Sequence, residues 1–183
     1  RSDHSARTRA AAMTDRSILI QPFGSLGQHG PHLPLATDSI LVEASARALV
    51  ERFGDEHDLW LLPTLTYTKS NEHAWSGGTV WLSATTMLAV IDDIARCLSL
   101  LPAKRLVFLN GHGGNSALLN VACRDVRLKY GFYTFLAHPH VPADHGGTSH
   151  DDELGMGIHG GIGETSAMLH VRRDRQATLH PSV

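Results

Sequence analysis

The sequence lacks several features that mark particular classes of protein. It has two cysteines, no cluster of lysine and arginine at a formal net charge of −2, and no apolar run of the roughly 18 residues that a transmembrane helix needs. We therefore expect no disulfide framework, no nucleic-acid partner and no membrane-spanning segment. Internal repeats and the G-x-G-x-x-G pattern of dinucleotide-binding loops are also missing, which disfavours a solenoid and an NAD- or nucleotide-binding protein.

The chain is of a size to form one domain with a substantial core. It has 183 residues, of which 42% are hydrophobic and 19% charged. Residues 1–16 are basic and alanine-rich without the apolar stretch of a secretory signal, so we interpret them as an N-terminal arm and residues 17–183 as a single domain. Cys97 and Cys123 fall at apolar positions of expected helices, which predicts buried free thiols in a cytoplasmic protein.

Strand-like and helix-like patterns alternate along the chain. Short apolar runs predict strands at 18–23, 58–66, 105–110 and 132–137, and apolar residues at three- and four-residue spacing predict helices at 38–52, 83–101, 116–130 and, more briefly, within 160–171. This alternation is typical of a mostly parallel sheet covered on both faces. We expect Ser83 to cap its helix, Gly131 to end the next one, and Leu128 to contribute to the core.

Histidine is unusually frequent, with 13 residues, and several lie in glycine-rich turns after the predicted strands. Three such turns also hold carboxylates or further histidines: His29, His32 and Asp38; His112; and His159 and Glu164. Loops that follow parallel strands open on one edge of the sheet, so these side chains can converge. Imidazole and carboxylate together suit Zn, Mn or Fe, which activate water for hydrolysis.

Each of these residues also has a purely structural interpretation. His29 could be a turn residue bonded to backbone, Asp38 a helix N-cap, His112 a loop histidine beside flexible glycines, and Glu164 an anion placed favourably at a helix N-terminus. Their joint occurrence in strand-following turns favours a metal site.

Two further segments are candidates for lining a pocket. The polar loop 69–79 follows a predicted strand and holds Trp75, and Trp81 lies just beyond it. Residues 138–157 are rich in Pro, Gly, Asp and His without apolar periodicity, which predicts a long mobile loop. We expect these segments to select the substrate, although loop 69–79 could equally be a surface crossover.

Three segments resemble the signature motifs of one enzyme family. Residues 24–38, the turn 110–115 (Asn-Gly-His-Gly-Gly-Asn) and residues 159–166 (His-Gly-Gly-Ile-Gly-Glu-Thr-Ser) are similar, in the right order, to the motifs of the creatininase family, the creatinine amidohydrolase-like metal hydrolases. The similarity extends from about residue 18 to residue 173.

The resemblance implies a three-layer α/β/α fold and one or two divalent metals, Zn foremost, with Mn or Fe as alternatives. It implies hydrolysis of a C–N bond in a small amide-type molecule, formamide, cyclic amidine or short modified peptide, and a homo-oligomer, a hexamer built as a trimer of dimers. Transferred to this sequence, His29, Asp38, His112 and Glu164 are the metal ligands, with Asp38 bridging two metals. His159 and Glu164 are the implied catalytic residues, His159 for proton transfer.

One position departs from the family pattern. The family reads Glu-Gln-His-Gly where this chain has Gly27-Gln28-His29-Gly30, so a glutamate ligand is missing. His32 or a water molecule could take its place, or the site could hold a single metal. The alternative function is therefore a catalytically impaired member that acts as a binding or assembly subunit. The resemblance also predicts a domain trimmed at its C-terminus.

Overall fold

The computed structural model describes residues 12–140 and 159–172 and has the predicted alternation of strands and helices. In chain order the elements are β1 (Ile18–Phe23), α2 (Thr37–Phe53), β2 (Leu59–Leu61), the 3₁₀ helix η1 (Asn71–His73), α3 (Ala84–Leu98), β3 (Arg105–Asn110), the 3₁₀ helix η2 (Gly113–Asn115), α4 (Ser116–Tyr130), β4 (Tyr133–Ala137) and α5 (Ile162–Val171).

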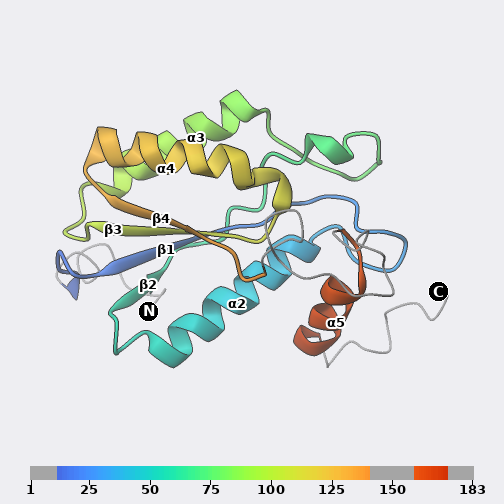
Figure 1. Ribbon diagram of the computed structural model, residues 1–183, viewed down its shortest axis with the longest axis horizontal. Coiled ribbons are helices and arrows are strands. Elements are labelled where there is room, and N and C mark those ends of the chain that lie inside the picture. The colour runs from blue at the N-terminus through green and yellow to red at the C-terminus, as the bar shows by residue number, and fades with distance from the viewer. Residues whose placement is uncertain (1–11, 141–158, 173–183) are drawn as a thin grey trace.

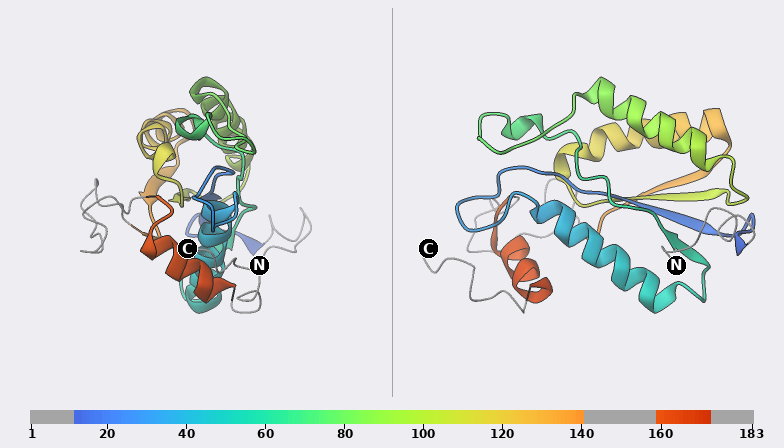
Figure 2. Two further views of the ribbon diagram at one scale, coloured as in Figure 1. Left: turned by 90° about the vertical axis from the view of Figure 1, so that its right-hand side faces the viewer. Right: turned by 180° about the vertical axis from the view of Figure 1, so that it is seen from behind.

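The four strands form one sheet in the order β2-β1-β3-β4, and each neighbouring pair is parallel. Helices α3 and α4 cover one face, whereas α2 and α5 lie on the other (Figure 1). The view from behind in Figure 2 shows the same three layers. The predicted three-layer α/β/α fold with a parallel sheet is therefore confirmed.

The sheet separates two apolar clusters, because successive residues of a strand point to opposite faces. Leu19 of β1 joins the larger cluster, in which Met87 and Ile91 of α3 and Leu119 of α4 are buried. Its neighbour Ile20 joins the smaller cluster on the other face, with Val42, Ala46 and Leu109. Both faces of the strands are thus covered, which explains why their apolar residues form runs rather than alternating with polar ones.

Helix boundaries follow the predicted signals. Ser83 caps α3 through its hydroxyl, which accepts the Thr86 N–H at 3.1 Å, and Gly131 ends α4 with a left-handed φ of 71°. Two burial predictions are wrong. Leu128 lies on the solvent side of α4 with 87% of its surface exposed, and Cys97 is exposed on α3, whereas Cys123 is a buried free thiol as predicted.

The second strand is shorter than the predicted 58–66. Leu62 and Leu65 donate hydrogen bonds to the carbonyls of Ile20 and Pro22, so the ladder against β1 has one extra residue between these two bonds. Pro22 of β1 faces this strand, since its carbonyl accepts from Leu65, but it has no N–H to donate, and the regular strand ends at Leu61. Leu65 still forms an isolated parallel bridge with Phe23.

Parts of the predicted arm and loop lie outside the described residues. These are residues 1–11 of the arm and 141–158, which include most of the predicted loop 138–157. Within the described part of the arm, Met13 is buried in the larger apolar cluster and Arg105 donates to the carbonyl of Asp15 at 2.8 Å. None of the helices in residues 12–140 and 159–172 is long and apolar enough to cross a membrane.

Candidate metal centre

The predicted site residues gather at the carboxyl edge of the sheet. His29 lies in the loop that leaves β1, His112 follows β3 by two residues, and Glu164 is in the first turn of α5. Figure 1 shows α5 beside the beginning of α2, the helix that carries Asp38 near its start. The contact between α2 and α5 thus brings residues from opposite ends of the chain together.

Glycine and asparagine bring the turn after β3 close to α2. A Cβ atom at Gly111 would lie 2.7 Å from the Val42 Cβ and 3.0 Å from the Asp38 carbonyl oxygen, so no larger residue fits there. The Asn110 side chain then holds the turn, since its Nδ2 donates to the His112 carbonyl at 2.8 Å and its Oδ1 accepts the His112 N–H at 3.2 Å. His112 is consequently fixed beside Asp38.

Asp38 is not the N-cap that its sequence position suggested. The N-cap residue of α2 is Ala36, and the buried Asp38 carboxylate lies between two histidines. Its Oδ1 is 3.0 Å from His29 Nε2, and its Oδ2 is 2.8 Å from His112 Nδ1. Oδ2 is nevertheless buried without accepting a hydrogen bond from any described residue. The two carboxylate oxygens thus face one imidazole each.

His29 is oriented from its far side. Its Nδ1 lies 3.0 Å from the Gly27 carbonyl oxygen and must donate there, which turns Nε2 toward the carboxylates. Nε2 faces Asp38 Oδ1 and, at 3.8 Å, Glu164 Oε1. The other oxygen of Glu164 accepts the Gly160 N–H at 2.5 Å, so that carboxylate is anchored to its own loop.

His112 contacts a carboxylate at each ring nitrogen. Besides Asp38 at Nδ1, Glu72 of η1 places its Oε1 2.6 Å from His112 Nε2. Glu72 Oε2 accepts a hydrogen bond from Lys69 Nζ at 3.0 Å.

Two further imidazoles stack beside this group. The rings of His73 and His159 lie 4.2 Å apart with an interplanar angle of 20°, and the His159 ring is 4.3 Å from that of His29. His159 Nε2 donates to the carbonyl oxygen of Gln28 at 2.5 Å, which leaves Nδ1 as the exchangeable nitrogen.

The ionisable side chains of this cluster shift one another's pKa values. Burial opposes ionisation of Asp38, but its contacts with His112 and His29 outweigh it and hold the pKa of Asp38 well below its usual range. Burial likewise opposes the His112 imidazolium, yet the adjacent carboxylates of Asp38 and Glu72 raise the pKa of His112 to about 9. The same competition between burial and Asp38 raises the pKa of His29. For Glu72, burial opposes the charged form, whereas the bond to His112 lowers the pKa to about 2.

These donors fit a divalent metal. Ligand atoms of His29, His159 and Glu164 lie within 4.8 Å of one another, and Asp38 Oδ2 is a buried acceptor without a hydrogen bond, directly beside His112 Nδ1. A cation between each imidazole and its carboxylate oxygen would satisfy both groups, since metal binding replaces the proton that otherwise links them. A mixed set of nitrogen and oxygen ligands suits Zn, Mn and Fe.

The structure brings together His29, Asp38, His112, His159 and Glu164, as predicted. His32, a possible substitute for the missing glutamate at Gly27, is not among the ligand atoms that lie within 4.8 Å of one another, and its Nε2 is 2.9 Å from Thr165 Oγ1. The sequence did not identify Glu72 and His73 individually as residues of the site. The only available signal was that loop 69–79 is polar and follows a strand.

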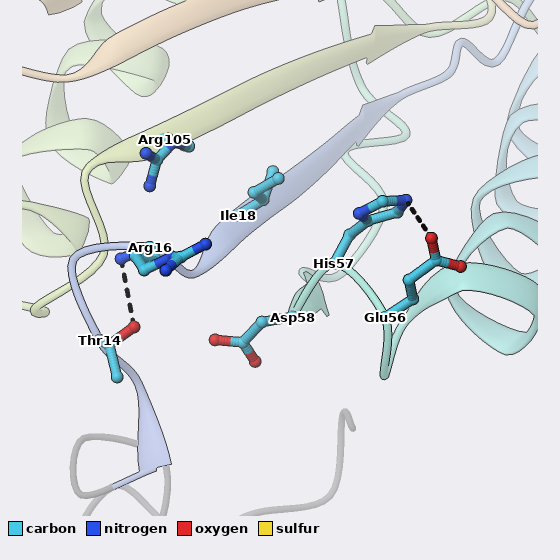
Figure 3. A pocket seen from close by; sticks show the side chains of 7 residues that line it. All are labelled: Thr14, Arg16, Ile18, Glu56, His57, Asp58 and Arg105. Atoms are coloured by element: carbon cyan, nitrogen blue, oxygen red, sulfur yellow. Dashed lines mark hydrogen bonds and ion pairs between the residues drawn. The ribbon is translucent and has the colours of Figure 1, made fainter.

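The site does not coincide with the cavity of about 480 Å³ in Figure 3. That cavity is lined by the first residues of β1 and β3, Ile18 and Arg105, together with Arg16 and Asp58. It therefore lies at the amino edge of the sheet, opposite the histidine cluster.

Comparison with known proteins gives consistent similarities. The profile of the creatininase family, described as creatinine amidohydrolase, matches residues 3–178. The chain is 36% identical over 160 residues to a mycofactocin precursor peptide peptidase of Mycobacterium ulcerans, covering 85% of this chain and 58% of that protein. It is 31% identical to a creatinine amidohydrolase of Pseudomonas putida, covering 86% and 65%. The chain thus spans less than two thirds of these relatives.

Solved structures of creatininases are also similar to this chain. A creatinine amidohydrolase (creatininase) superposes with a TM-score of 0.70 at 26% identity, covering 94% of this chain and 71% of that one. A structure named "Creatininase Mn" gives 0.69 at 27% identity, with 94% and 72% covered. From the profile match, the relatives and the fold, the chain belongs to the creatininase family.

Proposed function

We propose that this chain is a metal-dependent hydrolase that cleaves a C–N bond in a small amide or a short modified peptide. The observation that carries the proposal is the placement of Asp38, whose two buried carboxylate oxygens each face an imidazole nitrogen, His29 Nε2 at 3.0 Å and His112 Nδ1 at 2.8 Å. His29, Asp38, His112 and Glu164 would hold one or two ions of Zn, Mn or Fe. A mutant creatininase of "Zn-Zn type" and "Creatininase Mn" favour Zn or Mn.

When bound, such a metal lowers the pKa of coordinated water and polarises a carbonyl group. The chain's own residues then orient the substrate and move protons. His159 would deliver a proton from Nδ1 to the leaving nitrogen, because its Nε2–H is bonded to the Gln28 carbonyl. The ring of His73 stacked on His159 limits its rotation.

A peptide substrate is favoured over a cyclic amidine. Several relatives of 33 to 38% identity are named mycofactocin precursor peptide peptidase, whereas the creatinine amidohydrolase is 31% identical. Trp75, with 75% of its surface exposed in the loop that also carries His73, is available to contact a peptide.

The second candidate is the catalytically impaired member, which the absence of a side chain at Gly27 favours. One experiment separates the two candidates. The full chain is purified without chelator, its metal content is measured, and hydrolysis of a panel of short peptides and small amides is followed before and after metal removal with dipicolinate. We expect about one or two metal equivalents and turnover that is lost on removal and restored by Zn or Mn. Metal binding without turnover on any substrate favours the impaired member, and a chain that binds no metal refutes both the metal site and the reaction.

A further inference from the structure

Glu72 is a partly exposed carboxylate that lies outside the three motif segments 24–38, 110–115 and 159–166. It comes from the 3₁₀ helix η1, 40 residues before His112 in the sequence, and its side chain is 34% exposed. Its Oε1 lies 2.6 Å from His112 Nε2, one of the shorter polar contacts of the site.

The two ring nitrogens of His112 make different contacts. A neutral imidazole has one N–H and one lone pair. The carboxylate of Glu72 can only accept, so Nε2 donates to it, whereas the contact of Nδ1 with Asp38 Oδ2 at 2.8 Å lacks hydrogen-bond geometry and leaves Nδ1 as the nitrogen open to a metal. That oxygen is buried and accepts no hydrogen bond from the described residues, as expected of an atom that shares a cation with Nδ1.

We propose, resting on the metal-dependent function above, that Glu72 is a positioning residue that holds His112 with Nδ1 as its metal-binding nitrogen. Carboxylate–histidine–metal arrangements of this kind fix the ring orientation and increase the basicity of the ligand. Glu72 also adds a negative charge beside a centre in which Gly27 supplies no carboxylate.

Gly114, two residues after His112, makes room for this contact. A Cβ atom at Gly114 would lie 1.8 Å from Glu72 Oε1 and 2.6 Å from His112 Nε2, so any side chain there would displace the carboxylate. His29 shows the corresponding arrangement with a neutral partner, since its Nδ1 donates to the Gly27 carbonyl. Both histidines are thus anchored at the nitrogen that faces away from Asp38.

The test measures metal affinity rather than turnover. Zinc dissociation constants of the full-length wild type, E72Q, E72L and H112A are determined by competition with a chromophoric chelator. E56Q is the matched control, because exposed Glu56 contacts His57 at 3.5 Å in a pair remote from the centre. We expect E72L to weaken binding about 10- to 100-fold. E72Q, which keeps an acceptor oxygen, should weaken it less, and E56Q should leave it unchanged.

G114A supplies a second perturbation, because its Cβ would displace the Glu72 carboxylate and press on His112 Nε2, so it should also weaken zinc binding. Melting temperatures in chelator show whether each variant is folded. Wild-type affinity in folded E72L, with H112A weakened, overturns the role of Glu72 alone. Equal affinity in wild type and H112A, or no binding by either, overturns the proposed function as well.

Discussion

Replacing Gly27 by glutamate adds a carboxylate directly beside the histidine cluster. A Cβ atom at this position would lie 2.9 Å from Ser70 Oγ, 3.3 Å from Ser25 Oγ and 3.6 Å from His73 Cδ2, so the new side chain points among residues of the site. Rotating the Ser70 hydroxyl away relieves the closest contact but breaks its 3.2 Å hydrogen bond with Ser25. That loss costs about 0.5–1.5 kcal/mol. Removing a glycine from the unfolded chain offsets about 0.4–1 kcal/mol of it.

The metal-free stability of G27E should therefore stay close to that of the wild type, and the effect should appear when metal is added. A tenfold gain in affinity stabilises the saturated protein by about 1.4 kcal/mol. For a chain of this size, that corresponds to a rise in melting temperature of about 3–6 °C. The assay compares melting temperatures with excess zinc and with chelator.

G27A is the matched control, because it has the same contact with Ser70 but no carboxylate. The zinc-dependent shift of G27E minus that of G27A isolates the contribution of the carboxylate. Equal shifts in the two variants would refute the reasoning that residue 27 faces the metal centre.

Three other predictions need simpler measurements. D38N should raise the zinc dissociation constant by at least about 100-fold, since it removes the charge that faces both histidines, and full retention of zinc would contradict this. Iodoacetamide should label exposed Cys97 well before Cys123 at pH 7.5, because burial raises the pKa of the Cys123 thiol and lowers its thiolate fraction, and equal rates would contradict this burial. M87A should lower the free energy of unfolding, measured with urea, by about 2–5 kcal/mol, since Met87 is fully buried. L100A, on the exposed surface, should lower it by less than about 0.5 kcal/mol, and similar losses in the two variants would contradict the burial of Met87.

The elements that the sequence predicted best are those with a clear residue signal where the element ends. Strand 105–110 and helix 116–130 were predicted to the residue, because Gly111 follows the strand and Gly131 ends the helix. The strand at 58–66 was predicted too long, because an apolar run does not reveal the extra residue after Leu62 that interrupts regular pairing with β1. Burial of Leu128 was wrong for a related reason, since the apolar character of a residue does not specify which side of a helix it faces.

The same limit applies to predicting the residues of the site from the sequence. Loops after parallel strands predicted that His29, Asp38 and His112 would converge, and the sheet topology does bring them together. Glu72 and His73 could not be identified in this way. Their role depends on contacts with residues 40 and 86 positions away, made by one turn of 3₁₀ helix that has no distinctive pattern.

Gly27 is the residue that best distinguishes the two candidate functions, and its backbone also helps to form the site. Its side chain is missing, yet its carbonyl oxygen still accepts the Nδ1–H of His29 and directs Nε2 toward Asp38. His112 is anchored independently by Glu72. The orientation of both imidazoles therefore does not require a side chain at residue 27. What glycine removes is one negative charge, so an active and an impaired protein would differ in how strongly the centre retains a cation rather than in its shape.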